Sequence, residues 1–145
     1  MKILIINGPN LNLLGKRDST QYGSLTLKDI ENLVKKEYKN DIIEFFQSNI
    51  EGEIIEQIQK SINYFDGLII NAGGYSHTSV SIRDALDIIK IPKIEVHLSN
   101  LANREQFRQT LITAPVCNGY ISGFREKGYL AAVYLLKMMT ENNYA

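Results

Sequence analysis

Cysteine is nearly absent from this chain, in which Cys117 is the only one. A lone thiol excludes an internal disulfide and a metal site built from thiolates. An excess of charge is lacking too, since 16 basic residues balance 16 acidic ones. The zero net charge gives no sign of a nucleic acid or an anionic membrane as a partner.

Long apolar runs are also missing. The longest fall far short of the roughly 18 residues of a membrane span, and the stretch MKILIING is broken at Asn7 before the core of a signal peptide could form. The sequence contains no repeat, low-complexity tract or linker. With 145 residues, 44% of them hydrophobic, the chain is expected to form a single domain over residues 1–145, located in the cytoplasm.

Apolar runs and helical stripes alternate along the chain. KILIING (2–8) is a short apolar run that ends in a turn signal and predicts a buried strand, whereas the isoleucines of 51–65 are spaced as one face of a helix. Together these patterns predict strands at 2–8, 41–48, 66–74, 93–100 and 116–123 and helices at 26–39, 51–65, 79–90 and 129–139. Such an order predicts a doubly wound, five-stranded parallel sheet in three α/β/α layers, and flavodoxin-like strand order is favoured.

Phosphate-binding glycine motifs are absent from this α/β pattern. NAGG, residues 71–74, lacks G-x-G-x-x-G spacing and the P-loop lysine, and it is equally typical of a tight strand-to-helix turn. A flavin or nucleotide module is thereby disfavoured, and a flavin absorbance would identify one. A receiver-like signalling domain would need acidic residues at the strand ends, where IING and IINA place asparagines.

The segments after the first, third and fourth strands hold most of the candidate functional groups. Ligands of doubly wound sheets bind at the carboxyl ends of the strands, so NGPNLNLLGKRDSTQYG, NAGGYSHTS and HLSNLANREQFR are expected to meet at one edge. They contain both histidines, His77 and His97. Taken singly, each group also has an ordinary structural explanation. Glu95 either orients the His97 ring or lies at a solvated edge, and Arg104 with Arg108 is typical of a solvated face.

The charged segment GKRDSTQYGS, residues 15–24, is bounded by glycines and carries Arg17 and Tyr22. It is too polar for a strand and too short for a helix, so we expect a mobile loop. An aromatic side chain in such a loop either tethers it to the core or takes part in function.

Three motifs together resemble one enzyme family. INGPNLNLLGKRDSTQYG, NAGGYSHTSVSIRDAL and IEVHLSNLANREQFR closely resemble the type II 3-dehydroquinate dehydratases, over essentially the whole chain. The resemblance implies a single catalytic domain with a flavodoxin-like fold, a dodecamer built of trimers, and no metal or organic cofactor. It also implies the reversible dehydration of 3-dehydroquinate to 3-dehydroshikimate, by anti elimination through an enolate, in the shikimate or quinate pathway.

The resemblance also assigns roles to individual residues. Tyr22 matches the general base, Arg17 the essential arginine of the same loop, and His97 the general acid. Glu95 stands behind His97, and Asn10 matches the residue that holds the enolate-stabilising water. The substrate-binding set corresponds to Asn71, His77, Asp84, Leu98, Ser99 and Arg108, of which Asp84 would act across a subunit boundary.

The chemistry explains why a tyrosine would stand beside an arginine. Removing a proton next to a ketone needs a strong base and a stabilised enolate. Tyrosine has an ordinary pKa near 10, so only about one phenol in a thousand is ionised at pH 7, and a neighbouring guanidinium favours the ionised form. His97 would give its proton to the leaving hydroxyl. The helix that begins near Thr78 and Ser79 is expected to offer N–H groups to the substrate carboxylate.

Two features depart from the family pattern, and neither touches a matched catalytic position. Ala72 stands where the family often has proline, and Asn118 and Arg125 replace smaller or less charged residues. A Schiff-base lysine in a TIM barrel would catalyse the same overall reaction. That alternative is disfavoured because 145 residues are well short of the roughly 250 of a TIM barrel.

Overall fold

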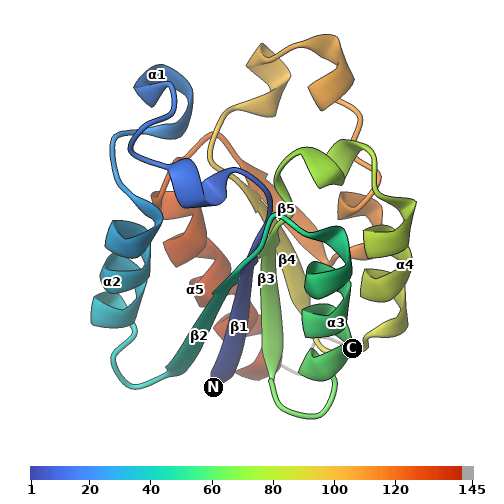
Figure 1. Ribbon diagram of the computed structural model, residues 1–145. Coiled ribbons are helices and arrows are strands. Elements are labelled where there is room, and N and C mark those ends of the chain that lie inside the picture. Colours follow the sequence, from blue (N-terminus) through green and yellow to red (C-terminus); the bar gives the residue numbers. More distant parts are fainter. Residues whose placement is uncertain (142–145) are drawn as a thin grey trace.

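A five-stranded parallel sheet forms the centre of the computed structural model, which describes residues 1–141 (Figure 1). The strand order is β2-β1-β3-β4-β5, and every neighbouring pair is parallel. The strands are β1 (Lys2–Asn7), β2 (Ile42–Gln47), β3 (Gly67–Asn71), β4 (Lys93–His97) and β5 (Gly119–Ser122). This order confirms the flavodoxin-like prediction.

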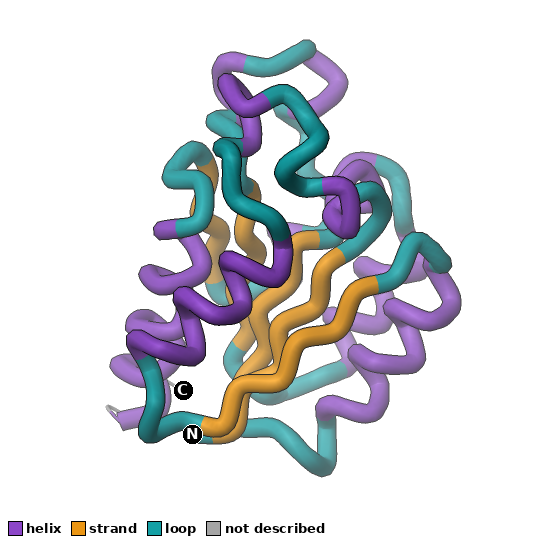
Figure 2. The backbone as a smooth tube through the Cα atoms, turned by 60° about the vertical axis from the view of Figure 1, so that its left-hand side comes forward, coloured by secondary structure: helices purple, strands orange, loops and turns teal. Residues whose placement is uncertain are grey.

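Helices cover both faces of the sheet, as the two views in Figures 1 and 2 show. Helices α2 (Leu27–Glu37) and α5 (Lys127–Glu141) pack on one face, and α3 (Glu51–Ser61) and α4 (Val80–Ile88) pack on the other. Within β1, Ile3 and Ile5 belong to the first core and Leu4 and Ile6 to the second. The alternation arises because successive side chains of a strand point to opposite faces. The predicted three-layer arrangement is therefore confirmed.

Most elements end a few residues inside the predicted bounds, because capping residues and turn glycines stop them. Helix α2 starts at Leu27 because Thr26 is its N-cap, with its hydroxyl accepting from the Asp29 N–H in a capping box. Strand β3 stops at Asn71, since Gly73 has a φ of 60° and opens the 3₁₀ turn η2 (Gly73–His77). Three further 3₁₀ turns, η3 (Leu101–Asn103), η4 (Gln106–Arg108) and η5 (Ala114–Val116), connect β4 to β5.

The segment 15–24 contains a helix that the sequence did not predict. The turn η1 (Leu11–Leu13) leads into this segment, and α1 (Ser19–Tyr22) is a single helical turn within it. The Asp18 side chain accepts a hydrogen bond from the Thr20 N–H at its start, and Gly23, with a φ of 80°, ends it. The expectation of a loop without helix is wrong here, because a local cap is enough to close one turn.

The ends of β1 and β3 approach each other closely at Gly8. The Gly8 N–H donates to the Asn71 carbonyl at 2.8 Å. A Cβ built on Gly8 would lie 2.5 Å from the carbonyl oxygen of Ala72, which is too close for any side chain. The two loops that leave these strands therefore start from a fixed separation. Among the described residues, no helix is long and apolar enough to cross a membrane.

Candidate active site

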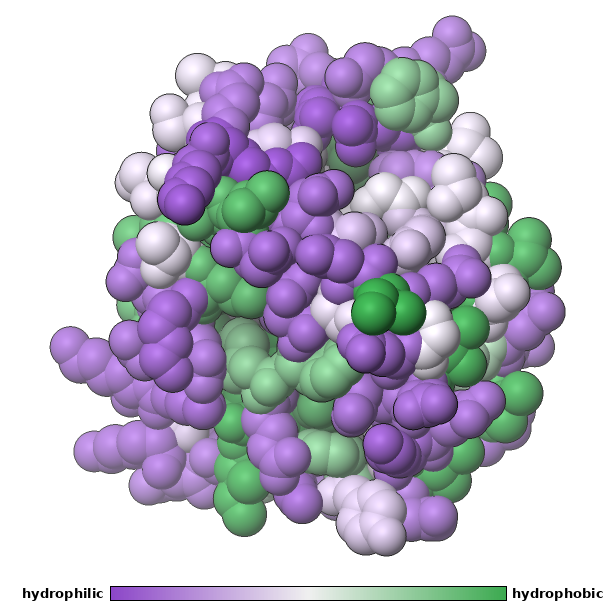
Figure 3. Space-filling model, in the orientation of Figure 1, coloured by the Kyte–Doolittle hydropathy of each residue, from purple (hydrophilic) through white to green (hydrophobic). Residues whose placement is uncertain are grey.

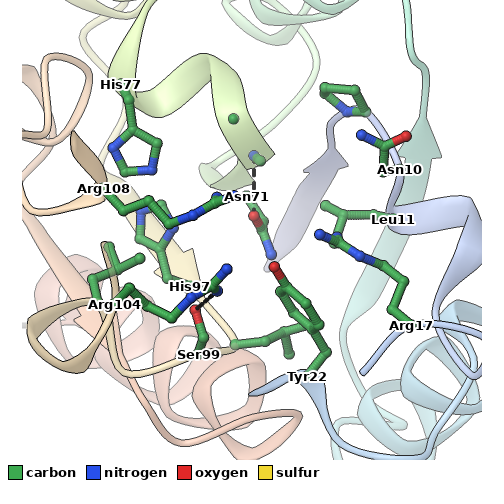
Figure 4. Close-up of a pocket in the computed structure, with 15 residues that line it drawn as sticks. Asn10, Leu11, Arg17, Tyr22, Asn71, His77, His97, Ser99, Arg104 and Arg108 are labelled. Carbon is green, nitrogen blue, oxygen red and sulfur yellow. Dashed lines mark hydrogen bonds between the residues drawn. The ribbon is translucent and has the colours of Figure 1, made fainter. Parts of the chain in front are cut away.

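A cavity of about 120 Å³ opens at the carboxyl ends of β1, β3 and β4 (Figure 4). This is the edge where the sequence predicted a site. The residues around it are Pro9, Asn10, Leu11, Arg17, Tyr22, Asn71, Gly73, Gly74, His77, His97, Leu98, Ser99, Leu101, Arg104 and Arg108. Every predicted site residue lines this cavity except Glu95, which lies behind His97, and Asp84.

Tyr22 lies at the end of α1 with a guanidinium group over its ring. The Cζ atom of Arg17 is 3.8 Å from the ring centroid, and that of Arg104 is 5.3 Å away. Cations in such positions are attracted by the face of the ring. Arg17 and Tyr22, which the sequence places on one segment, are thus in contact in the structure. The guanidinium of Arg104 is a second cation near the same ring.

Arg104 is the charged cavity residue that sequence reasoning missed. Its spacing from Arg108 suggested a solvated face, yet its side chain is only 8% exposed. The chain turns back through η3 after β4, and the Arg104 guanidinium donates to the Ser99 Oγ at 2.9 Å. The available signal was its place within LSNLANREQFR, between two predicted site residues.

His97 belongs to a buried hydrogen-bonded chain at the end of β4. Its Nε2 is 2.6 Å from Oε1 of Glu95, whose other oxygen accepts from the Thr113 hydroxyl at 2.6 Å. Glu95 is fully buried because β4 lies between β3 and β5, so the solvated-edge reading is wrong. An ionised carboxylate only accepts hydrogen bonds. The Nε2 of His97 therefore carries a hydrogen, and Nδ1 is left for a ligand.

The remaining cavity residues present mostly hydrogen-bond donors. His77 Nδ1 donates to the Thr110 carbonyl at 2.9 Å, which leaves Nε2 for a ligand. The Arg108 Nε donates to Glu105 at 2.8 Å. Leu98 and Ser99 continue from the end of β4, and both are buried.

Asn10 starts the segment that leads from β1 toward Arg17 and Tyr22. It has a φ of 67°, a conformation that asparagine tolerates better than most residues. Its N–H donates to Asn49 Oδ1 at 3.0 Å, which anchors the start of the segment. The Asn10 side chain reaches the cavity from this anchored position.

The resemblance predicts that Asp84 acts in a neighbouring subunit's cavity, and the sequence predicts that the start of α4 offers N–H groups to the substrate. Asp84 lies on α4 with its side chain 63% exposed, 3.5 Å from Arg83 and outside the cavity of its own chain. The start of α4 at Thr78 and Ser79 does not line the cavity either. The Ser79 hydroxyl accepts from the Ile82 N–H and donates to Glu51, so it caps the helix. Backbone of η2, at Gly73 and Gly74, faces the cavity instead.

Within residues 1–141, no group of three or more histidine, cysteine, aspartate or glutamate side chains is placed to hold a metal ion. The residues that line the cavity include acid–base groups and cations. At the strand ends of this flavodoxin-like domain, a tyrosine lies beside two cations and a histidine is bonded to a buried glutamate. These groups are suited to the acid–base chemistry of a lyase.

Comparisons with known proteins define the family. The family model described as dehydroquinase class II matches residues 1–137, and the chain belongs to this family. It is 49% identical to a 3-dehydroquinate dehydratase of Thermotoga petrophila over 143 residues, which cover 97% of this chain and 98% of the relative. It is 50% identical to a 3-dehydroquinate dehydratase of Nitratiruptor over 144 residues, 97% and 92% of the two chains.

The solved structures agree with this assignment. The crystal structure of type II dehydroquinase from Butyrivibrio crossotus superposes with a TM-score of 0.91 at 48% identity, covering 94% of this chain and 97% of that one. The activity is accordingly that of a type II 3-dehydroquinate dehydratase, a hydro-lyase of the shikimate pathway. The predicted family, fold and activity are confirmed.

Proposed function

We propose that the cavity carries out this dehydration as an anti elimination through an enolate. Tyr22, as the phenolate, takes the proton from the carbon next to the ketone, and the electrons of that C–H bond form the enolate. The carbonyl then re-forms, a double bond forms between the α and β carbons, and the C–O bond to the β hydroxyl breaks. His97 gives its proton to the departing oxygen, so that water leaves.

The other cavity residues bind and polarise the substrate in this proposal. Arg17 and Arg104 place positive charge beside Tyr22, which favours the phenolate. Asn10 holds a water against the enolate oxygen. The substrate is bound by Asn71, His77, Leu98, Ser99 and Arg108, whose donors suit a carboxylate and hydroxyl groups.

One observation carries the proposal: a tyrosine flanked by two guanidinium groups and a histidine backed by a buried carboxylate line the same cavity. The first arrangement suits a base, because it stabilises the anion left by proton loss. The second suits an acid, because the carboxylate stabilises a doubly protonated imidazole.

Substitution of each partner tests the two roles separately. Turnover is followed by the absorbance of the conjugated enone, and exchange of the α-proton is followed in deuterated water. His97→Ala is expected to lose about 10²–10⁴-fold in turnover while the α-proton still exchanges. Tyr22→Phe is expected to lose both.

The control is Tyr64→Phe, which alters an exposed tyrosine outside the cavity. Near-normal turnover in His97→Ala would remove this residue from the mechanism. Substantial activity in Tyr22→Phe would mean that another base operates.

We also propose that the enzyme works in the cytoplasm as a homo-oligomer, a dodecamer built of trimers, in which Asp84 reaches a neighbouring cavity. Two observations support this assembly. Asp84 is exposed and does not line its own cavity. Large apolar side chains are exposed along β5 and α5, among them Tyr120, Tyr134 and Leu135.

A further inference from the structure

We infer that Tyr129 is a positioning residue for the reaction: its buried hydroxyl holds the amide of Asn71 in the one orientation that presents an N–H group to the substrate. The inference rests on the proposed role of Asn71 in substrate binding and adds a residue outside the cavity to it. Tyr129 lies in the first turns of α5 and is fully buried.

Close packing at Gly128 brings the Tyr129 hydroxyl beneath the site. A Cβ on Gly128 would lie 3.2 Å from Val96 Cγ1 and 3.5 Å from Ile121 Cγ2, so the start of α5 rests directly on β4 and β5. From there the Tyr129 hydroxyl reaches Asn7 and Asn71, the last residues of β1 and β3. These two asparagines are paired in the register of the sheet.

The direction of each hydrogen bond in this chain follows from one backbone group. The Gly73 N–H can only donate, and it lies 3.2 Å from Asn71 Oδ1, which fixes that atom as the acceptor. Asn71 Nδ2 then faces the Tyr129 hydroxyl at 3.0 Å and donates to it. The tyrosine proton must therefore go to Asn7 Oδ1, at 2.5 Å.

The consequence is that Asn71 meets a ligand as a donor. Its Oδ1 is engaged by Gly73 and one hydrogen of Nδ2 by Tyr129, so the second hydrogen of Nδ2 is the group left for the cavity that Asn71 lines. Without the tyrosine hydroxyl, the amide keeps only its contact with Gly73. Its nitrogen is then free to rotate away from the productive direction.

The hydrogen-bonded series formed by Asn7, Tyr129 and Asn71 does not maximise the stability of the fold. Asn7 is fully buried, and its Nδ2 has no hydrogen-bond partner among the described residues. Leaving a buried amide unpaired costs free energy of folding. Apolar side chains at positions 7 and 129 would avoid that cost, so the polar chain is better explained by what it does to Asn71.

A double-mutant cycle tests the inference. KM and kcat are measured for the parent, Tyr129→Phe, Asn71→Ala and the double variant. Tyr129→Phe is expected to lower kcat/KM about tenfold, the size of one lost hydrogen bond. The change should appear mainly in KM, because Asn71 takes no part in proton transfer. In the Asn71→Ala background, the same substitution should change kcat/KM less than about twofold.

Tyr38→Phe is the matched control. It also deletes a tyrosine hydroxyl that bonds to α5, here to the Leu130 carbonyl at 2.8 Å, but neither residue lines the cavity. It should leave kcat/KM within about twofold of the parent. Thermal unfolding of each variant separates the loss of stability from the loss of binding.

Three outcomes would overturn the inference. An unchanged kcat/KM in Tyr129→Phe would do so, as would an equal loss with and without Asn71. If Asn71→Ala itself has no effect, the proposed binding role of Asn71 falls and the inference falls with it, whereas the first two outcomes leave that role intact. If Tyr129→Phe does not fold, Asn7→Ala takes its place, because it removes the acceptor of the tyrosine proton. The same pattern across the cycle is then expected.

Discussion

At the scale of single residues, Tyr22 contacts two guanidinium groups that come from different parts of the chain. Arg17 belongs to the segment that also carries the tyrosine, whereas Arg104 follows the turn η3 and is bonded to Ser99. Arg104 therefore stays in the cavity whatever the segment 15–24 does. Arg17 shares the segment with the tyrosine, whereas the contact of Arg104 with the ring depends on where this segment lies.

Removal of Arg17 should change the shape of the pH profile. Arg17→Ala is expected to lose most activity near neutral pH and to regain part of it as the pH rises, because the phenol then ionises without the cation. Recovery should be incomplete, since we expect the cation also to order the segment. Turnover is measured from about pH 6 to pH 10.

Lys16→Ala is the control for this experiment, because it removes a charge from the same segment but lies outside the cavity. A profile of Arg17→Ala that is parallel to the parent's at reduced height would contradict the idea. Arg17 would then position the segment or the substrate without acting on the tyrosine.

Lysine chemistry is expected to be absent from the reaction. No lysine of the described chain lines the cavity, and the one buried lysine, Lys93, lies at the opposite end of β4 from His97. Burial lowers the pKa of Lys93, but its Nζ is bonded to the Ile89 carbonyl. Borohydride added together with substrate should leave activity intact. Inactivation with a reduced ligand attached to a lysine would contradict the enolate route.

At the scale of elements, α5 is tied to the sheet by an ion pair as well as by its apolar face. The Asp41 carboxylate, just before β2, accepts from Lys137 at 2.6 Å and from the amino group of Met1 at 2.8 Å. Burial raises the pKa of Asp41, but the hydrogen bonds from Lys137 and Met1 together outweigh it and hold the pKa below its ordinary value. This pair links the last turns of α5 to the edge of the sheet.

The stability contributed by Asp41 should depend on pH. A carboxyl group whose pKa is lower in the folded state stabilises the fold above its unfolded pKa of about 3.9, and this contribution is lost as the pH falls through the folded value. Asp41→Asn is therefore expected to cost about 2 kcal/mol in free energy of unfolding at pH 7. The difference from the parent should shrink below about pH 4.

Glu44→Gln is the control for this measurement by denaturant unfolding, because it breaks an exposed pair with Lys2. Its effect should stay within about 0.5 kcal/mol. If the cost of Asp41→Asn is unchanged at low pH, the charge of Asp41 is not its cause.

Periodicity predicted the elements well, because each helix and strand buries one repeating face. Ile54 and Ile58 of α3, for example, are fully buried as their spacing indicates. Contacts between residues far apart in the sequence could not be predicted from periodicity. The bond between Tyr129 and Asn7 spans 122 positions, and the place of Arg104 depends on the turn η3 and on its bond to Ser99. The cavity residues were found because strand ends converge. Of the residues that hold them in place, Glu95 was found because it lies two positions before His97 in one strand, whereas Tyr129 carries no local signal.

At the scale of the whole molecule, several large apolar side chains remain exposed on the surface of the single chain. Hydrophilic side chains cover most of the face in Figure 3, with apolar patches between them. Helix α5 buries Tyr129, Ala132 and Leu136 inside the subunit and still exposes Tyr134 and Leu135. The apolar side chains of this helix are thus explained only in part by the fold of one chain.

Hybrid oligomers are the sharpest test of the proposed assembly. Asp84→Ala and Tyr22→Phe should each be nearly inactive when assembled alone. If Asp84 acts in a neighbouring cavity, oligomers re-formed from a mixture of the two variants should regain part of the activity, because some cavities then receive both intact residues. Sedimentation of the parent should show a species several times heavier than 16.5 kDa. A fully active monomer would rule out the assembly.

The close approach of Gly8 to Ala72 fixes the cavity residues next to them, Pro9, Asn71 and Gly73, more firmly than the side chains elsewhere in the cavity. Side chains such as Tyr22 and Arg108 can rotate to admit a bulkier molecule, but two hydrogen-bonded strands cannot part without breaking their ladder. An inhibitor enlarged toward the segment 15–24 should therefore still find room. One enlarged toward the β1–β3 junction should be rejected, whatever side chains surround it.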